Sequence, residues 1–267
     1  MFRQNCVAMA VGLALMHWAA AGTAETITVT DDLSLNDVQH SQTQTHRYDQ
    51  NVIYDNTIKL NGQGGEKNLT IDVMGGQGSF TINNRRDAIS LSGSNVHLTL
   101  NGSLVMDGSH YQAIDISNGN NKTIDISGDL IYTNAWGPAV NASNGASAKD
   151  VYIRVGGKAQ FSNIRIGGEN HFPANTAVLN LRATNFEAQG GIEIDTVSLE
   201  ASNDGPVIFV QSGSLKAGDS DIIIRNITSK KRQGLATTSM YAQESDIVAG
   251  NILVENFTDE AGGGNGF

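Results

Sequence analysis

Apolar and polar residues alternate in short runs through the middle of the chain, and the same runs return at a nearly fixed step. The run at residues 88–92 (AISLS) returns at 113–117 (AIDIS) and again at 139–143 (AVNAS), after steps of 25 and 26 residues. Alternation with a period of two is typical of a β-strand that has one buried face. Repetition at a step of this length indicates a solenoid, in which each repeat stacks on its neighbours.

Each repeat contains three alternating runs, which are separated by clusters of Ser, Asn and Gly that favour turns. Three strands and three turns in about 25 residues make one coil of a parallel β-helix. We therefore predict a right-handed single-stranded parallel β-helix with three short strands per coil and coils about 4.8 Å apart. The other two runs of the repeat are NLTIDV, NVHLTL and NKTIDI at 68–73, 95–100 and 121–126, with a looser copy at 150–155, and GSLVM and GDLIY at 102–106 and 128–132.

The repeat also predicts which side chains share a place in each coil. Small residues at Ala88, Ala113 and Ala139 fit a tight corner. Apolar residues form an interior column, for which we expect Ile71, Leu98, Ile124 and Ile153. An antiparallel β-sandwich is the competing fold, since its strands also recur at short intervals, but a sandwich gives no reason for the strands to repeat in sequence.

Beyond residue 160 the repeat drifts without vanishing. Residues 205–213 echo 137–145, and residues 251–256 echo 221–226. We therefore predict one continuous β-helix over 61–267, preceded by an N-terminal cap and first coil at 25–60. At the observed step the chain is long enough for about nine or ten coils.

The segment 1–24 has the pattern of a secretory signal peptide. Arg3 supplies the positive start, residues 7–21 are apolar, and Ala24 ends a stretch of small residues, so Glu25 is the expected mature start. Cys6 is the single cysteine and lies in this leader, so the mature chain has no disulfide. The pattern predicts export across the inner membrane.

The net charge of −10 disfavours nucleic acid and anionic membranes as partners. Outside the leader the sequence has no apolar run long enough to predict a membrane span. The chain ends in GGGNGF, which has the pattern of an open turn rather than of a polar cap. We therefore expect a fragment, or one module of a longer protein.

Four aspartates occupy outward strand positions. Outward carboxylates on a β-helix can hold calcium or act as acid and base. Alternating strands also need polar residues on their solvated face, and this explanation is favoured because no pair recurs in a fixed motif. We assign no catalytic, cofactor or metal residue. The aspartates are Asp72, Asp115, Asp125 and Asp195, and the histidines, which lack metal-ligand spacing, are His17, His40, His46, His97, His110 and His171.

Other residues with recognisable chemistry lie in predicted turns. The turns at 85–87 (Arg85, Arg86, Asp87) and 110–111 (His110, Tyr111) are one repeat apart, so they could touch and offer a carbohydrate contact, while solvated turns are the default interpretation. The basic run at 230–232 is expected in an exposed loop. Tyr132 and Trp136 are candidates for an aromatic sugar platform, and a stack at the edge of a coil explains them equally well. Six Asn-x-Ser/Thr sequons fall at Asn68, Asn101, Asn121, Asn141, Asn226 and Asn256, where we expect turns.

The signal peptide, the cysteine-free mature chain and the coil at 88–93 followed by 96–102 resemble the passenger domains of bacterial autotransporters, of the pertactin-like or adhesin-like type. The resemblance covers roughly residues 50–260. It implies a Gram-negative origin, display at the cell surface or outer membrane, and a role in adhesion, aggregation or biofilm formation. It also implies host or bacterial surface glycans or proteins as partners, or self-association.

Two functions therefore compete. The first is a non-enzymatic surface scaffold that binds through the flank of its solenoid. The second is a polysaccharide lyase or glycoside hydrolase on a pectin-lyase-like β-helix, which needs a groove with Asp, Arg and Lys clustered on one strand face. The first is favoured.

Overall fold

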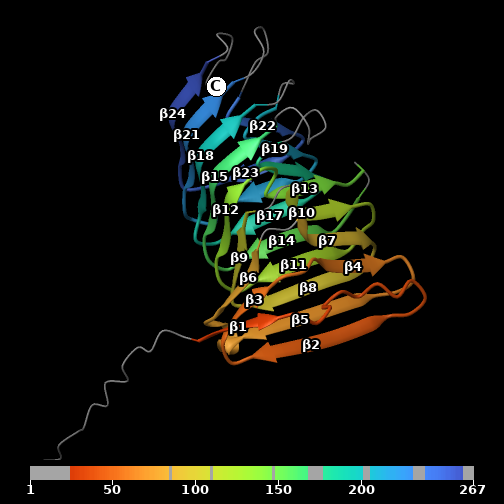
Figure 1. Cartoon of the computed structure of the whole chain (residues 1–267). Helices are drawn as coiled ribbons and strands as arrows, with labels where there is room; N and C mark the ends of the chain where they lie inside the picture. Colours follow the sequence, from red (N-terminus) through yellow and green to blue (C-terminus); the bar gives the residue numbers. More distant parts are fainter. Residues whose placement is uncertain are drawn as a thin grey trace, which may run out of the picture.

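The protein is a stack of coils in which three parallel sheets run along the molecule (Figure 1). The computed structural model describes residues 25–83, 86–108, 111–145, 148–167, 177–200, 205–230 and 238–260. Each coil adds one strand to each sheet. The predicted parallel β-helix with three strands per coil is confirmed, and the parallel pairing rules out the antiparallel sandwich.

The three sheets are named A, B and C. In spatial order, sheet A contains β1 (Thr26–Val29), β3 (Asn51–Tyr54), β6 (Ser79–Asn83), β9 (Ser103–Asp107), β12 (Leu130–Ala135), β15 (Ala159–Ile166), β18 (Ile192–Leu199), β21 (Ile222–Ser229) and β24 (Ile252–Asp259). Sheet B contains β22 (Met240–Gln243), β19 (Ile208–Gln211), β16 (Leu179–Arg182), β13 (Val140–Ser143), β10 (Gln112–Ser117), β7 (Asp87–Gly93) and β4 (Ile58–Gly62). Sheet C contains β2 (Gln42–Tyr48), β5 (Lys67–Val73), β8 (Val96–Asn101), β11 (Lys122–Ile126), β14 (Val151–Val155), β17 (Asn185–Ala188), β20 (Ser214–Lys216) and β23 (Asp246–Val248). Helix in the described part of the chain is limited to one 3₁₀ turn, η1 (Met74–Gly76).

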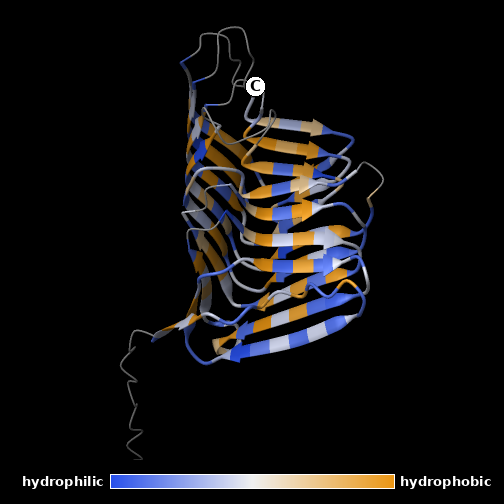
Figure 2. Ribbon diagram, turned by 45° about the vertical axis from the view of Figure 1, so that its right-hand side comes forward, coloured by the Kyte–Doolittle hydropathy of each residue, from blue (hydrophilic) through white to orange (hydrophobic). Residues whose placement is uncertain are grey.

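The core is a set of apolar columns that run along the solenoid axis. Figure 2 shows the alternation that builds it, with hydrophobic and hydrophilic residues following one another along the stacked strands. Leu98, Ile124 and Ile153 are paired in register and buried, as predicted. Leu69, rather than Ile71, is the next member of this column, because Ile71 pairs with Leu100. The slip is two positions, which leaves the same side chains facing inward.

The corner between sheets A and B is lined by the predicted alanines. Ala88, Ala113 and Ala139 are all buried at the start of their sheet B strands. The backbone N–H of Ala113 donates to the Pro138 carbonyl at 2.9 Å, so a hydrogen bond joins this corner to the next coil. In the later coils Val178 and Val207, which are also buried, take the same position, so the corner holds small to medium apolar side chains.

The described residues form about seven turns of the solenoid, whereas the step of the repeat predicts about nine or ten for the chain. The later coils are longer than those in the middle of the chain. In sheet A, Ala159 pairs with Ile192, Ile192 with Ile222, and Ile222 with Ile252, so each of these coils takes up more of the chain than the repeat at 88–139 does. The drift of the repeat after residue 160 is therefore a lengthening of the coils.

Two lysines are buried inside the stack, where the pattern predicts apolar residues. Lys122 donates to the carbonyls of Ser117 (2.6 Å) and Asn118 (2.7 Å), and lies 3.3 Å from the Asn144 Oδ1. Lys67 donates in the same way to the His40 carbonyl. Burial lowers the pKa of Lys122 to about 8. Both amines therefore donate to backbone carbonyls at the turns between sheets B and C.

Candidate functional site

The later strands of sheet A bend sharply at one residue. Each bend residue has a left-handed backbone, with φ between 53° and 57°, and the register of the strands skips it. Asn is one of the few L-residues that adopt this conformation readily. Each strand has one such residue at the same position, so the bends stack from coil to coil and the register continues on both sides of them. The bend residues in β12, β15, β18, β21 and β24 are Asn134, Asn163, Thr196, Asn226 and Asn256.

Side-chain hydrogen bonds link these bends from coil to coil. The Asn163 amide donates to Asn134 at 2.6 Å, and Asn134 in turn donates to Asp107 at 2.9 Å. On the later coils Asn256 donates to Asn226 at 2.9 Å. The result is a row of amides and one hydroxyl along the outer side of sheet A.

A groove of about 470 Å³ lies beside this row. Residues on both sides of each bend line it, and the buried Ala135, Ile164 and Val197 contribute apolar atoms. Most of the side chains that reach the groove from the outer face of the sheet are polar. These are Asn134, Asn163, Arg165, Thr196, Ser198, Asn226 and Thr228, together with the indole of Trp136.

Trp136 is the aromatic residue that lines the groove, and the charged side chain of Arg165 lies against its ring. Its residue exposure is 48%, which is large for tryptophan. The guanidinium carbon of Arg165 lies 5.0 Å from the centre of the Trp136 ring. Arg165 is also ion-paired with Glu200, whose carboxylate lies 4.0 Å from the Lys230 amine. The positive charge beside the indole is therefore neutralised within the protein.

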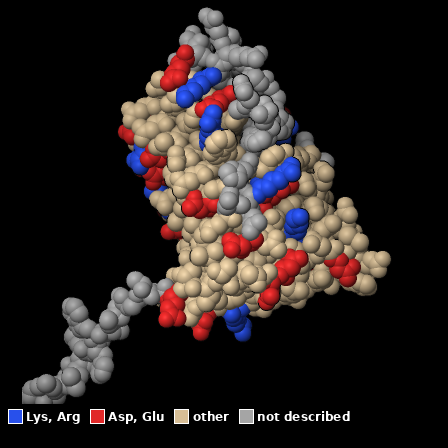
Figure 3. Space-filling view, viewed as in Figure 1, with Lys and Arg blue, Asp and Glu red and all other residues tan. Residues whose placement is uncertain are grey.

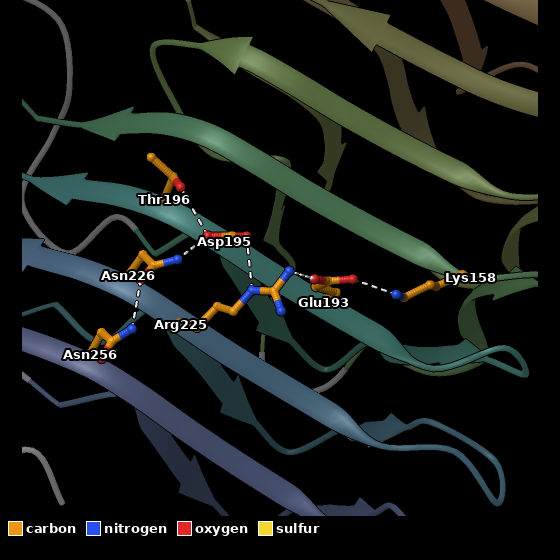
Figure 4. Close-up of polar contacts among 7 residues, drawn as sticks. All are labelled: Lys158, Glu193, Asp195, Thr196, Arg225, Asn226 and Asn256. Atoms are coloured by element: carbon orange, nitrogen blue, oxygen red, sulfur yellow. Dashed lines mark hydrogen bonds and ion pairs between the residues drawn. The ribbon is translucent and has the colours of Figure 1, made fainter.

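A charged network borders the groove on the same sheet (Figure 4). Arg225 lies between two carboxylates of β18: its Nε donates to Asp195 at 2.9 Å, and it is also paired with Glu193. Lys158 pairs with Glu193 from the preceding coil. Asp195 accepts further bonds from Thr196 and Asn226, which line the groove.

The network keeps both carboxylates ionised. The hydrogen bond from Lys158 lowers the pKa of Glu193. Burial alone raises the pKa of Asp195, but the bonds from Asn226, Arg225 and Thr196 outweigh it and the net shift is downward. The pKa of Arg225 is raised by its bond to Asp195. A general acid of a glycosidase needs a raised carboxyl pKa, so this pair lacks the electrostatics for that role.

The four predicted outward aspartates lie on three different sheets. Asp72 and Asp125 are on sheet C, Asp115 is on sheet B and Asp195 is on sheet A. Asp125 is ion-paired with Arg154 at 2.9 Å. The described residues contain no group of three acidic, His or Cys side chains placed to hold a metal ion.

The turn contacts are partly confirmed. The Arg86 guanidinium lies 4.5 Å from the centre of the Tyr111 ring, so the two turns do meet. The described histidines are scattered: His40 contacts Asp37, His46 contacts Gln44, and His97 contacts Thr123. The residues of these predictions that lie outside the described part of the chain are Arg85, His110, His17, His171, Lys231 and Arg232.

Two expectations about surface residues are wrong. Tyr132 is fully buried and donates to the Gly137 carbonyl at 3.2 Å, so it forms no platform with Trp136. Its position on β12 faces inward, whereas Trp136 follows the bend. Most of the sequon asparagines lie in strands rather than in turns, two of them at the bends of sheet A. Those in strands are Asn68, Asn101, Asn141, Asn226 and Asn256.

The alternation of the sequence does not single out Arg165, Asn163 and Thr196 as groove residues. A signal for them exists all the same. A triplet made of a polar residue, then Asn or Thr, then an apolar residue occurs at 133–135, 162–164, 195–197, 225–227 and 255–257. This triplet marks the bend in each later strand of sheet A.

Comparisons with family models, with curated proteins and with solved structures found no match to this chain. No helix within the described residues is long and apolar enough to cross a membrane.

Figure 3 shows acidic side chains scattered over the visible face, several of them beside a lysine or arginine.

Proposed function

We propose that this protein is an exported, non-enzymatic scaffold of the autotransporter-passenger type, which acts in adhesion or aggregation by binding a surface saccharide in the groove beside Trp136. The single observation that carries the proposal is the composition of that groove. An exposed indole stands at the edge of a row of amides and hydroxyls that repeats from coil to coil.

Saccharides are recognised by this combination of groups. An aromatic ring packs against the apolar face of a sugar, while amides and hydroxyls both donate to and accept from its hydroxyl groups. The repeat of the solenoid sets similar polar groups about 4.8 Å apart along the axis, which suits an extended chain of sugars. Because Arg165 is neutralised by Glu200, we expect a neutral saccharide rather than an acidic one.

The enzymatic alternative has less support. Asp, Glu, Arg and Lys do cluster on one face of sheet A, as that alternative requires. However, the two carboxylates are bound by cations and have lowered pKa values, so neither is poised as a general acid. A lyase also needs a basic group with an accessible lone pair, and Arg225 has a raised pKa.

A glycan array with the purified chain tests the saccharide proposal. Trp136→Ala is expected to lose at least tenfold in affinity for each glycan bound, because aromatic stacking contributes much of the contact. Tyr241→Ala is the matched control, since Tyr241 is also exposed (45%) but lies on sheet B. Equal loss in both variants, or release of cleaved sugar from a bound glycan, would contradict the proposal.

Export and surface display form a separate part of the proposal. The charged start, the apolar stretch and the small residues of segment 1–24 support it. In a Gram-negative host, we expect the mature protein to begin at Glu25 and to be accessible to a surface-labelling reagent on intact cells. Protein of full length that is retained in the cytoplasm would contradict this part.

A further inference from the structure

A second hollow, of about 220 Å³, lies on the outer face of sheet C, on a different side of the solenoid from the groove of sheet A. Four consecutive strands of that sheet, β8, β11, β14 and β17, build it. Its polar residues form two columns, the first paired in register from coil to coil and the second two residues farther along the chain. The columns are Thr99, Asp125, Arg154 and Glu187, and Asn101, Ser127, Gly156 and Gln189. We call this set the sheet C hollow.

The hollow opens where the second column lacks a side chain. Backbone hydrogen bonds carry the parallel ladder on through this column, as between the Gly156 N–H and the Ile126 carbonyl at 2.8 Å. Because residue 156 is glycine, no side chain separates Ser127 from Gln189 there. The volume is below the range of about 300–1,000 Å³ that is usual for drug-sized ligands, so the hollow suits one small ring.

The charges that line the hollow do not balance. Asp125 is ion-paired with Arg154 at 2.9 Å, and the Arg154 guanidinium carbon also lies 4.5 Å from the centre of the Tyr152 ring. Glu187 is half-buried and stands in register between Arg154 and Lys216. Within the described part of the chain, however, neither an ion pair nor a hydrogen bond reaches the Glu187 carboxylate. The lining therefore keeps one negative charge without a partner.

The neutral side chains of the hollow are available as well. The Thr99 hydroxyl and the amides of Asn101 and Gln189 line it, and among the described residues these three side chains have no hydrogen-bond partner. The Ser127 Oγ accepts from the Gly102 N–H at 2.9 Å, which leaves its own O–H to donate. Hydroxyls and amides both donate and accept, so these groups match the hydroxyls of a ligand.

We propose that the sheet C hollow binds a small hydroxylated amine, namely a single amino-sugar ring with a free amino group. The Glu187 carboxylate only accepts hydrogen bonds and is negative, so an ammonium group supplies both the donors and the charge that it lacks. Thr99, Asn101 and Gln189 then meet the hydroxyls of the ring. This site differs in place and in charge from the groove beside Trp136, and it does not rest on the saccharide proposal made for that groove.

Other classes of ligand fit the hollow less well. A divalent cation such as Ca²⁺ takes about six to eight oxygen ligands, and the described residues hold no group of three acidic, His or Cys side chains placed for a metal. The Arg154 guanidinium would also repel such a cation. An anion would be repelled by Glu187, and Arg154 is already paired with Asp125. A neutral sugar would leave the Glu187 carboxylate without a cation.

Calorimetric titration of the full chain with glucosamine tests this site, at a slightly acidic pH where the amino group is protonated. We expect saturable binding to the wild type, and at least tenfold weaker binding of N-acetylglucosamine, which has the same ring without the charge. Glu187→Gln keeps the shape of the side chain and should weaken glucosamine binding at least tenfold. Asp246→Asn is the matched control, because it removes an exposed carboxylate from β23 of the same sheet, outside the hollow.

Four results would overturn the inference. They are no saturable binding of glucosamine, equal affinity for glucosamine and N-acetylglucosamine, equal loss in Glu187→Gln and Asp246→Asn, and a loss in Trp136→Ala that Glu187→Gln does not show. The last result would place the amino sugar in the groove of sheet A. Circular dichroism confirms that each variant is folded before titration. Failure of the saccharide proposal leaves this site intact, since Trp136→Ala should bind glucosamine as the wild type does.

Discussion

Replacement of Asp115 by asparagine should stabilise the protein at neutral pH. The Asp115 carboxylate is ionised at pH 7 although burial opposes its charge. Asparagine has nearly the same shape, stays neutral, and can accept the same hydrogen bond from Asn141. The substitution therefore removes an unfavourable buried charge without opening a cavity.

The size of the effect follows from the pKa of Asp115, which is about 6 in the folded protein against an ordinary value of 3.8. A gap of that size corresponds to at most roughly 3 kcal/mol. Since Asp115 is only partly buried, solvent screening reduces this to about 1–2 kcal/mol. The raised pKa favours folding below pH 4 or so, and this contribution is lost as the pH rises through 6.

Urea denaturation at pH 7 and at pH 4 measures the effect. Asp115→Asn should raise the free energy of unfolding by about 1–2 kcal/mol at pH 7 and change it little at pH 4, where both side chains are neutral in the folded state. Asp125→Asn, which loses the exposed pair with Arg154, should be neutral or slightly destabilising at pH 7. A destabilised Asp115→Asn at pH 7, or an equal gain at both pH values, would refute the reasoning.

Four further substitutions, at three positions, test the fold, each by urea denaturation. Ile124→Ala, in the interior column, should lower the free energy of unfolding by about 2–5 kcal/mol, and no change would show that the column is not packed. Asn226→Ala should cost about 1–2 kcal/mol and Asn226→Gly less, because glycine adopts the left-handed bend with less strain than alanine; the reverse order would contradict the bend. The pKa of Lys122 is lowered, so between about pH 8 and 10.5 the unfolded chain binds more protons than the folded protein. The free energy of unfolding of the wild type should therefore rise relative to that of Lys122→Met as the pH increases across this range. A difference between the two proteins that does not change with pH would contradict the lowered pKa.

The sequence predicts the coil well because two periods coincide in it. Alternation fixes which side chains face inward, and the nearly constant step of the repeat fixes which strands stack. Ala113 and Ile124 are buried for these reasons. The same logic does not determine register to better than two positions, since a slip of two preserves the inward face. This is why the pattern places Ile71 in the column that Leu69 occupies.

The candidate site is less predictable, because it depends on backbone bends and on the lengths of the turns. Trp136 is recognisable as an aromatic residue near a turn, but its partner Arg165 belongs to the next coil and meets it only through the stack. Tyr132 looks equally suited to a sugar platform, and only the register shows that it faces inward. The partial burial of Asp115 is likewise hidden, since its alternation pattern matches that of the more exposed Asp125.

Fluorescence of Trp136 tests the central claim most directly. The chain has two tryptophans, Trp18 and Trp136, so a Trp18→Phe variant of the full chain reports the groove alone. Titration with a glycan selected on the array should change the emission of Trp136 in a saturable way, with the same midpoint as binding. Unchanged emission at full binding would place the saccharide elsewhere on the solenoid and contradict the account.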